Sequence, residues 1–93
     1  ATTAIDTFAQ TSYVAAKYLI TAENASSGEV HTQELLISAD GTVTNFVPFA
    51  DVFTGAGPLF TIAVSGTNPV SVDVTNLDGA NALNVQFMRT TLA

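Results

Sequence analysis

The sequence lacks most of the residues on which catalysis, disulfide bonding and nucleic-acid binding depend. Its 93 residues include no cysteine and one histidine, which excludes disulfides, thiolate metal sites and Cys–His catalysis. Only Lys17 and Arg89 are basic against eight acidic residues, so the net charge is −6. Two cations cannot neutralise a run of phosphates or hold a protein on anionic lipid. We therefore expect no affinity for nucleic acid and no membrane attachment.

Charged residues of either sign are scarce. They make up 11% of the chain, where ordinary domains carry about 25%, and the mean hydropathy is +0.38. The surface must then consist largely of Thr, Ser, Asn and apolar side chains. Such a surface suits a protein that buries part of itself against other subunits. We expect a homo-oligomer, or contact with other proteins of an assembly.

Long apolar runs are also missing. The longest apolar stretch, Tyr13–Ile20, is interrupted by Lys17 and falls far short of the ~20 residues of a membrane span. The first ten residues carry neither the basic nor the apolar segment of a targeting signal. The sequence therefore predicts neither a transmembrane helix nor a leader.

What the sequence does contain is a strong signal for β-structure. Val, Ile and Thr account for 28 of the 93 residues, and these β-branched side chains favour strands. Apolar and polar side chains alternate over three segments, and each such segment predicts a strand with one buried face. The three segments are Phe60–Ser65, Val70–Thr75 and Leu83–Met88.

Turn signals divide the rest of the chain into four further predicted strands. Asp40-Gly41 is the strongest of these signals and predicts a two-residue hairpin. The further strands are Ala4–Phe8, Tyr13–Glu23, Val30–Ser38 and Thr42–Phe53, and the last becomes two strands if Pro48 interrupts it. The sequence therefore predicts one all-β domain over residues 1–93, an antiparallel β-sandwich of seven or eight strands, either jelly-roll-like or immunoglobulin-like.

The segment from residue 12 to residue 23 also has features of a helix. It contains good helix formers, and Ser12 is a possible N-cap. As a helix, however, it has only a poor apolar stripe. As a strand it places Val14, Ala16, Tyr18 and Ile20 on one face, with Lys17 on the other. We predict a strand.

Residues suited to chemistry are few and scattered. His31 lies in a predicted strand near Glu29 and Gln33, but a metal site needs at least three converging ligands. We interpret His31 as a solvent-facing or interface residue. Asn76–Gly79 superficially resembles a calcium loop, yet it lacks the alternating oxygen ligands and the closing Glu, so we interpret it as a turn. No Gly-x-Ser-x-Gly motif is present. We expect no enzymatic activity, no metal and no cofactor.

Three phenylalanines, Phe46, Phe49 and Phe53, cluster around Pro48. Strict alternation places Phe49 and Phe53 on one face and Phe46 on the other, unless a bulge at Pro48 changes the register. Our first interpretation is that all three belong to the core. The alternative is that one of them is an exposed anchor for another subunit, which makes the three candidate interface residues. We accordingly expect the segment Asn45–Pro58 to contribute most to an interface.

Several short motifs occur together in an order that resembles a known module. The order resembles a small β-sandwich module of virion structural proteins of tailed bacteriophages, notably marine cyanophages with large contractile tails. The motifs are Ile5-Asp-Thr-Phe8, Ala16-Lys-Tyr18, Gln33-Glu-Leu-Leu-Ile37 before Asp40-Gly41, and Arg89-Thr-Thr-Leu92. They span nearly the whole chain, although residues 45–68 are richer in Phe, Gly and Pro than the family pattern.

The resemblance implies structural positions and no catalytic residues. The positions that match are Asp6, Phe8, Lys17, Tyr18, Glu34, Asp40, Gly41 and Arg89. Because Lys17 and Arg89 are the only strong cations in an acidic domain, we expect each to pair with a carboxylate, and Glu34 is a reasonable partner.

The resemblance also implies a role in a virus particle. The chain begins near the start of the module and ends at its terminal motif, so we expect one module standing alone. The first choice is a multi-copy capsid decoration or cement protein, made in the host cytoplasm, that contacts itself and the major capsid protein in the virion. A neck, tail or fibre component is the alternative within the particle. From another class, an adhesive or carbohydrate-binding module of a bacterial surface protein would be favoured by several aromatics on one sheet face.

Overall fold

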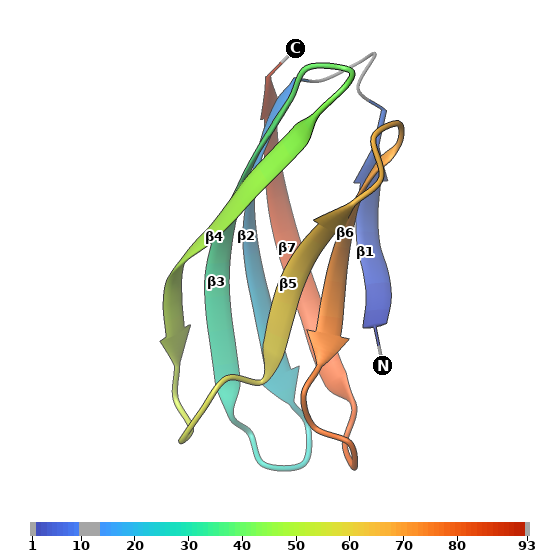
Figure 1. The fold of residues 1–93 in the computed structure, drawn as a ribbon. Coiled ribbons are helices and arrows are strands. Elements are labelled where there is room, and N and C mark those ends of the chain that lie inside the picture. Colours follow the sequence, from blue (N-terminus) through green and yellow to red (C-terminus); the bar gives the residue numbers. More distant parts are fainter. Residues whose placement is uncertain (1, 10–13, 93) are drawn as a thin grey trace.

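The computed structural model describes residues 2–9 and 14–92, and every helix or strand element within them is a β-strand. The strands form a sandwich with extents of 40, 22 and 16 Å (Figure 1). They are β1 (Thr2–Phe8), β2 (Ala15–Asn24), β3 (Val30–Ala39), β4 (Thr44–Phe53), β5 (Phe60–Ser65), β6 (Val70–Asn76) and β7 (Leu83–Leu92). The predicted all-β sandwich is confirmed, with seven strands.

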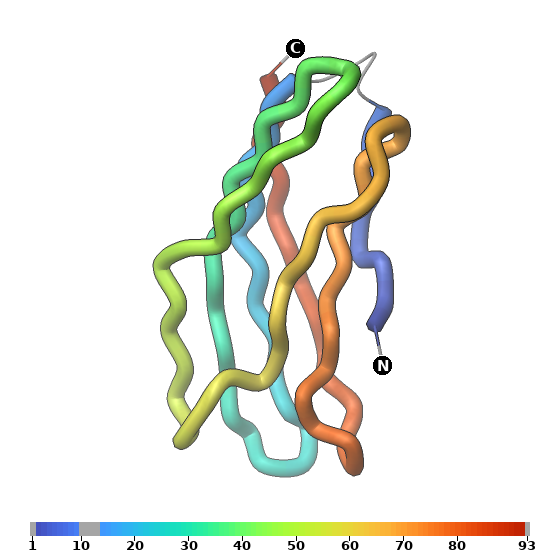
Figure 2. Tube along the Cα trace, in the orientation of Figure 1, coloured from blue at the N-terminus to red at the C-terminus, as the bar shows by residue number. Residues whose placement is uncertain are grey.

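Two antiparallel sheets make up the sandwich. The smaller sheet has the order β1-β6-β5, and the larger sheet has the order β4-β3-β2-β7. Strands β2, β3 and β4 follow one another as hairpins, and β7 returns to lie beside β2, as the trace in Figure 2 shows. The spatial order 7-2-3-4 is that of a Greek key.

The segment with helical features is a strand. In β2, buried Ala16, Tyr18 and Ile20 alternate with exposed Lys17 and outward-facing neighbours, so the prediction of a strand is confirmed. The possible N-cap, Ser12, lies outside the described residues. The burial of alternate side chains against the second sheet outweighs the local helix propensity of this segment.

A backbone hydrogen bond closes the hairpin between β3 and β4. Ala39 pairs with Thr44, and Asp40 N donates to the Val43 carbonyl (3.1 Å), which leaves Gly41 and Thr42 at the tip. The Asp40 carboxylate accepts hydrogen bonds from the N–H groups of Thr42 (2.9 Å) and Val43 (2.7 Å), and Gly41 adopts a φ of 90°. These bonds hold the Asp40 pKa below its usual range. The two-residue hairpin that Asp40-Gly41 predicts is therefore present, with its tip one residue further along, at Gly41 and Thr42.

Strand β4 runs unbroken through Pro48, as an edge strand permits. The irregularity lies just beyond it, where Ala50 and Asp51 stand opposite Gln33 and Ala50 has a φ of 54°. This β-bulge changes the register, so Phe49 faces outward whereas Asp51 and Phe53 face the inner side. The prediction that Pro48 is the point of disruption was wrong.

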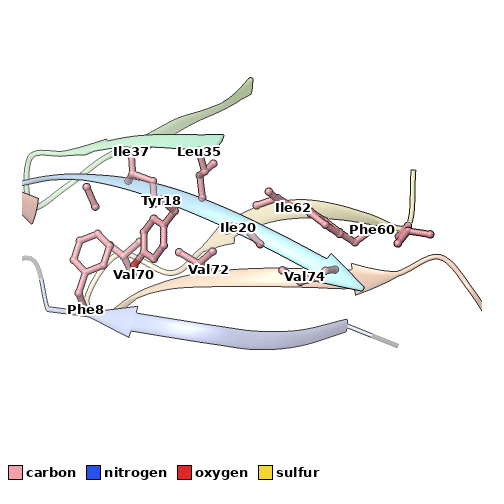
Figure 3. Close-up of a cluster of buried hydrophobic side chains, with 13 residues drawn as sticks. Phe8, Tyr18, Ile20, Leu35, Ile37, Phe60, Ile62, Val70, Val72 and Val74 are labelled. Atoms are coloured by element: carbon pink, nitrogen blue, oxygen red, sulfur yellow. The ribbon is translucent and has the colours of Figure 1, made fainter. Parts of the chain in front are cut away.

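The core lies between the inner faces of the two sheets (Figure 3). Tyr18, Ile20, Leu35 and Ile37 come from the larger sheet and pack against β5, β6 and Phe8 of β1. Full burial of an apolar side chain of this size stabilises the fold by about 1.5–3 kcal/mol. Because the larger sheet has one strand more than the smaller, the inner face of its edge strand β4 is only partly covered.

Candidate interaction surface

Large apolar side chains project from the outer face of the larger sheet, the side away from the core. They come from all four strands. Leu19 and Leu36 are outward neighbours of buried residues in β2 and β3, and strand pairing sets the others, from β4 and β7, on the same side of the sheet. Their exposed fractions range from 36% to 70%. We call this surface the apolar face; its large apolar side chains are Leu19, Leu36, Val47, Phe49, Val52, Met88 and Leu92.

Strand pairing arranges these side chains in rows across the sheet. Met88 is opposite Leu19, Leu19 is opposite Glu34, and Glu34 is opposite Phe49, which makes one row from β7 to β4. In the next row the order is Thr90, Lys17, Leu36 and Val47. Both rows therefore have one charged side chain near the middle. Their end positions are apolar, except that Thr90 stands at one end of the second row.

The two central charges form an ion pair. Lys17 Nζ lies 3.3 Å from Glu34 Oε1 and 5.9 Å from the centroid of the Phe49 ring. The expected pairing of Lys17 with Glu34 is confirmed. Both side chains are partly exposed, so the pair adds no more than about 1 kcal/mol to stability. Its larger effect is to leave the centre of the apolar face without net charge.

Most of the acidic excess lies away from the apolar face. Glu34 is paired with Lys17, and Glu23 is at the end of β2. The remaining carboxylates are on loops, on the smaller sheet or on the inner side of β4; they are Asp6, Glu29, Asp40, Asp51, Asp73 and Asp78. The negative charge of the chain thus lies mainly outside the apolar face, whose central charges are the paired Lys17 and Glu34.

A shallow hollow of about 510 Å³ lies on the apolar face between β2, β3 and β7. The residues that border it combine apolar groups with hydroxyls and one amide. They are Leu19, Thr21, Thr32, Gln86, Phe87 and Met88; the Phe87 ring itself is on the inner side of β7, against Tyr18. No charged group lines this hollow, so it suits an apolar side chain of another protein better than an ionic ligand.

The three candidate phenylalanines are divided by the sheet. Phe49 is on the apolar face, whereas Phe46 and Phe53 are on the inner side of β4, where the smaller sheet covers them incompletely. Their exposed fractions are 36–39%, so the interpretation of all three as core was wrong. Because β4 is an edge strand, neither of its faces is fully covered. Their role as interface residues stays a prediction.

The second strong cation links the two sheets. Asp6 Oδ2 accepts hydrogen bonds from the Tyr18 hydroxyl (2.7 Å) and from Arg89 Nη1 (3.0 Å). Asp6 belongs to the smaller sheet and both donors to the larger, and a register shift in β1 turns Asp6 inward. Burial, together with the hydrogen bond to Asp6, raises the pKa of Tyr18. The expected carboxylate partner of Arg89 is confirmed and is Asp6 rather than Glu34.

His31 is in the interior, so its interpretation as a solvent-facing residue was wrong. The side chain is 1% exposed, and its ring is stacked on Phe60 with the centroids 4.1 Å apart. Nδ1 accepts a hydrogen bond from the Leu59 N–H (3.0 Å), and Nε2 contacts the Asp51 carboxylate. The sequence held the signal for this position, because His31 shares its strand face with Leu35 and Ile37.

The His31–Asp51 pair has two of the three parts of a hydrolytic triad, but its geometry serves structure. In a triad one imidazole nitrogen bonds the carboxylate and the other faces the nucleophile. Here the second nitrogen is occupied by a backbone N–H, and the ring is enclosed by Phe53 and Phe60. The pair fastens the bulged part of β4 to the sandwich.

The remaining acidic residues organise turns. Asp78 accepts hydrogen bonds from Ala80 N (2.8 Å), Asn81 N (3.2 Å) and Asn24 Nδ2 (3.0 Å), and these bonds lower its pKa. The Asn76–Gly79 segment is therefore the turn that the sequence predicts. Within residues 2–9 and 14–92, no three His, Asp or Glu side chains converge in a way that could hold a metal ion.

The part of the chain that the structure describes contains no helix of the length and apolarity needed to cross a membrane. The sequence matches no protein-family model and no curated protein. The function must therefore be argued from the surface described above.

Proposed function

We propose that the chain is a non-enzymatic structural subunit of a tailed-bacteriophage virion, present in many copies, with capsid decoration or cementing as its first role. The observation that carries this proposal is the apolar face. Seven large apolar side chains project there around a single ion pair. Monomeric proteins rarely expose continuous apolar patches larger than a few hundred Å², and larger patches mark interaction sites.

The size of the apolar face agrees with this role. Strands spaced ~4.8 Å apart, with ~3.3 Å per residue, give a four-stranded sheet of ten-residue strands a face of roughly 19 by 33 Å. Its flat area is then roughly 600 Å², and side-chain relief increases the accessible area. A stable protein interface buries about 800 Å² on each partner. One protein contact can therefore cover the whole face.

The family-matched residues have structural roles that fit a non-catalytic module. Asp6, Tyr18 and Arg89 join the two sheets, and Lys17 pairs with Glu34 across β2 and β3. Phe8 belongs to the core, and Asp40 with Gly41 shapes the β3–β4 hairpin.

The glycan-binding alternative is less well supported. It calls for several aromatic side chains on one sheet face, where they can offer flat apolar surface to a sugar ring. Among the described residues, Phe49 is the one aromatic side chain on the apolar face. We therefore retain assembly into a particle as the proposed function.

The test begins with purified particles of the encoding phage. We expect mass spectrometry to detect the chain in many copies per particle, and a density map to place the sandwich on the outside of the capsid shell. Particles that lack the chain should bind purified chain to saturation in a co-sedimentation assay. Absence of the chain from particles, together with no binding to deficient particles, would contradict the proposal. A position on the neck, tail or fibre would retain the virion role and correct the site.

A further inference from the structure

We infer that His31 is an acid-sensitive switch, which fastens the connection between β4 and β5, residues 54–59, to the larger sheet at neutral pH and releases it when the imidazole takes up a second proton. The inference is independent of the virion role, because it concerns the response of the fold itself to pH. It rests on the two bonds that this buried ring makes inside the sandwich. His31 is also the one histidine of the sequence, so a change at histidine pH can be assigned to it.

The two bonds of the imidazole fix its protonation state. Nδ1 accepts a hydrogen bond from the Leu59 N–H (3.0 Å), so Nδ1 carries no proton. A neutral imidazole has one protonated nitrogen, which must then be Nε2, and Nε2 donates to the Asp51 carboxylate. The closed arrangement thus requires the neutral ring. A charged imidazolium has two N–H donors and no acceptor, so its Nδ1–H would point at the N–H of Leu59.

Protonation therefore breaks the bond to Leu59 and keeps the bond to Asp51. The Asp51 carboxylate attracts a positive ring, so Nε2 retains its partner. The ring has little room to turn away from Leu59, because it is buried, stacked on Phe60 and edge-on to Phe53. The group that can move is the backbone at Leu59, at the end of the connection.

The connection is anchored at both of its ends. At its start, Thr54 N donates to the Val30 carbonyl (2.9 Å), and the Thr54 hydroxyl accepts from the Val30 N–H (3.0 Å). At its end, the Leu59 carbonyl accepts from the N–H of Leu77, on the loop after β6 (3.0 Å). Residues 55–58 include two glycines, which tolerate a change of backbone conformation. Loss of the imidazole bond thus frees Leu59 from the larger sheet and leaves it bonded to the side of the smaller sheet.

The charged group in contact with the ring is Asp51 of β4. The connection itself has no ionisable side chain, and the inward side chains of β5 and β6 are apolar. Two further carboxylates lie near the ends of the connection: that of Glu29 is beside Gly55, and that of Asp78 is bonded to Asn24. The other ionisable groups of β2, β3 and β6 face outward or are bonded elsewhere; they are Lys17, Tyr18, Glu23, Glu34 and Asp73.

The direction of the pH effect follows from proton uptake. Histidine side chains change charge between about pH 5 and 8. The unfolded chain takes up the second proton in this range and the closed arrangement excludes it, so the stability from the Leu59 bond is present at high pH and is lost as pH falls. Asp40 and Asp78 have pKa values lowered by their hydrogen bonds, so the stability that they add is lost only in the more acidic carboxylate range.

Nitrogen NMR of the natural chain tests the protonation state directly. At about pH 7.5 we expect one proton on Nε2 of His31 and none on Nδ1, and at about pH 5 we expect a charged ring. Over the same interval, the protection of the Leu59 amide against hydrogen exchange should fall at least about tenfold, after correction for the intrinsic exchange rate at each pH. The amides of the central strand β6 should keep their protection, because the opening is local.

Two variants separate the switch from a merely structural role. His31→Gln offers the Leu59 N–H a neutral acceptor that cannot become charged, so its urea midpoint should stay constant between about pH 7.5 and 5, where that of the natural chain falls. Asp51→Asn removes the negative partner of the imidazolium, so the transition should move to lower pH. The matched control Asp73→Asn removes a carboxylate from the outer face of the smaller sheet and should leave the pH profile unchanged.

Four results would each overturn the inference. They are a proton on Nδ1 at about pH 7.5, a ring that stays neutral at about pH 5, a charged ring with unchanged protection of the Leu59 amide, and a folded His31→Gln variant that keeps the pH dependence of the natural chain. If His31→Gln does not fold, the NMR measurements on the natural chain decide the question by themselves. None of these measurements uses phage particles, so the inference and the proposed function fail separately.

Discussion

The outer faces of the two sheets differ sharply, although their inner faces are built alike. On the smaller sheet the outward side chains are small and polar or methyl-sized; they are Thr2, Ala4, Thr7, Thr61, Ala63, Ser65, Ser71, Asp73 and Thr75. Several of them bond to one another, as Asp73 does to Ser65 and Ser71 at 2.7 Å. On the larger sheet the outward side chains include seven large apolar groups.

The difference shows which strand positions the fold leaves unconstrained. A two-layer sandwich needs apolar side chains only where the layers meet, so the outward positions can take any residue that tolerates a strand. The smaller sheet uses that freedom for water-compatible side chains. The larger sheet does so only in part, because seven large apolar groups lie among its polar outward residues, and their exposed surface adds nothing to the stability of a monomer. Their presence is therefore better explained by an interaction than by the fold.

The largest expected effect separates inward from outward positions on both sheets. Ile37→Ala and Ile62→Ala remove buried side chains and should each lower the free energy of unfolding by about 2–5 kcal/mol. Their outward neighbours Leu36→Ala and Thr61→Ala should change it by less than about 1 kcal/mol. Urea denaturation of dilute protein, where any dimer has dissociated, measures all four. A loss at Leu36 as large as that at Ile37 would mean that the apolar face supports the monomer fold.

The next largest effect on stability is expected from Asp6, whose side chain links the two sheets. Asp6→Ala leaves the buried Tyr18 hydroxyl without its acceptor and Arg89 without this carboxylate, so we expect a loss of about 1–3 kcal/mol. Asp73→Ala removes a carboxylate from the outer face of the same sheet and should cost clearly less. Equal losses in the two variants would show that the link between the sheets adds nothing special to stability.

High pH should test the same link without a mutation. Tyr18 has its pKa raised by burial and by the bond to Asp6, so the folded chain holds this proton more tightly than the unfolded chain does. The stability that results is complete below pH 10, the ordinary pKa of tyrosine, and is lost as pH rises above it. We expect the urea midpoint to fall above pH 10 in the natural chain. Tyr18→Phe should show a smaller fall, and identical pH profiles would contradict the assignment.

The smallest effect concerns the bulge that follows Phe49 and turns Asp51 and Phe53 to the inner side of β4. Ala50 adopts a left-handed conformation that glycine reaches without strain. Ala50→Gly should therefore raise the free energy of unfolding by about 0.5 kcal/mol, after allowance for the extra freedom of glycine in the unfolded chain. Thermal melting compares it with Ala63→Gly in a regular strand, which should be destabilising. A destabilised Ala50→Gly variant would mean that the bulge is held with alanine for a reason other than backbone conformation.

The sequence was informative wherever a signal repeats every second residue. Alternation located three of the strands, turn signals divided the rest of the chain into the other four, and alternation chose a strand over a helix for the segment around Tyr18. Alternation also places His31 on the same strand face as Leu35 and Ile37, although we interpreted this lone histidine as a solvent-facing or interface residue. The ion pairs between strands were predictable in part, because the sequence contains only two strong cations and eight carboxylates, so each cation was expected to have a carboxylate partner.

Two features had no local signal. The bulge at Ala50 and Asp51 contains neither glycine nor proline, whereas the nearby Pro48 is the residue that typically interrupts a strand. The apolar face depends on the order of strands, which brings Met88 near Leu19 and Glu34 near Phe49 from distant parts of the chain. The predicted contact segment, Asn45–Pro58, contains only one side of this surface. Non-local pairing cannot be found from the period of single strands.

The positions of the first and last strands bear on how the module would carry mechanical load. Strands β1 and β7 run in the same direction, and Thr2 and Leu92 lie toward opposite ends of the sandwich (Figure 1). A pull between the two ends of the chain therefore acts along the strands. It must slide β1 past β6 and β7 past β2, which strains many hydrogen bonds of each ladder at once instead of opening them one after another. The bonds from Arg89 and Tyr18 to Asp6 cross directly between the layers that are pulled apart. A force applied between Thr2 and Leu92 would therefore act in the most resistant direction of the fold.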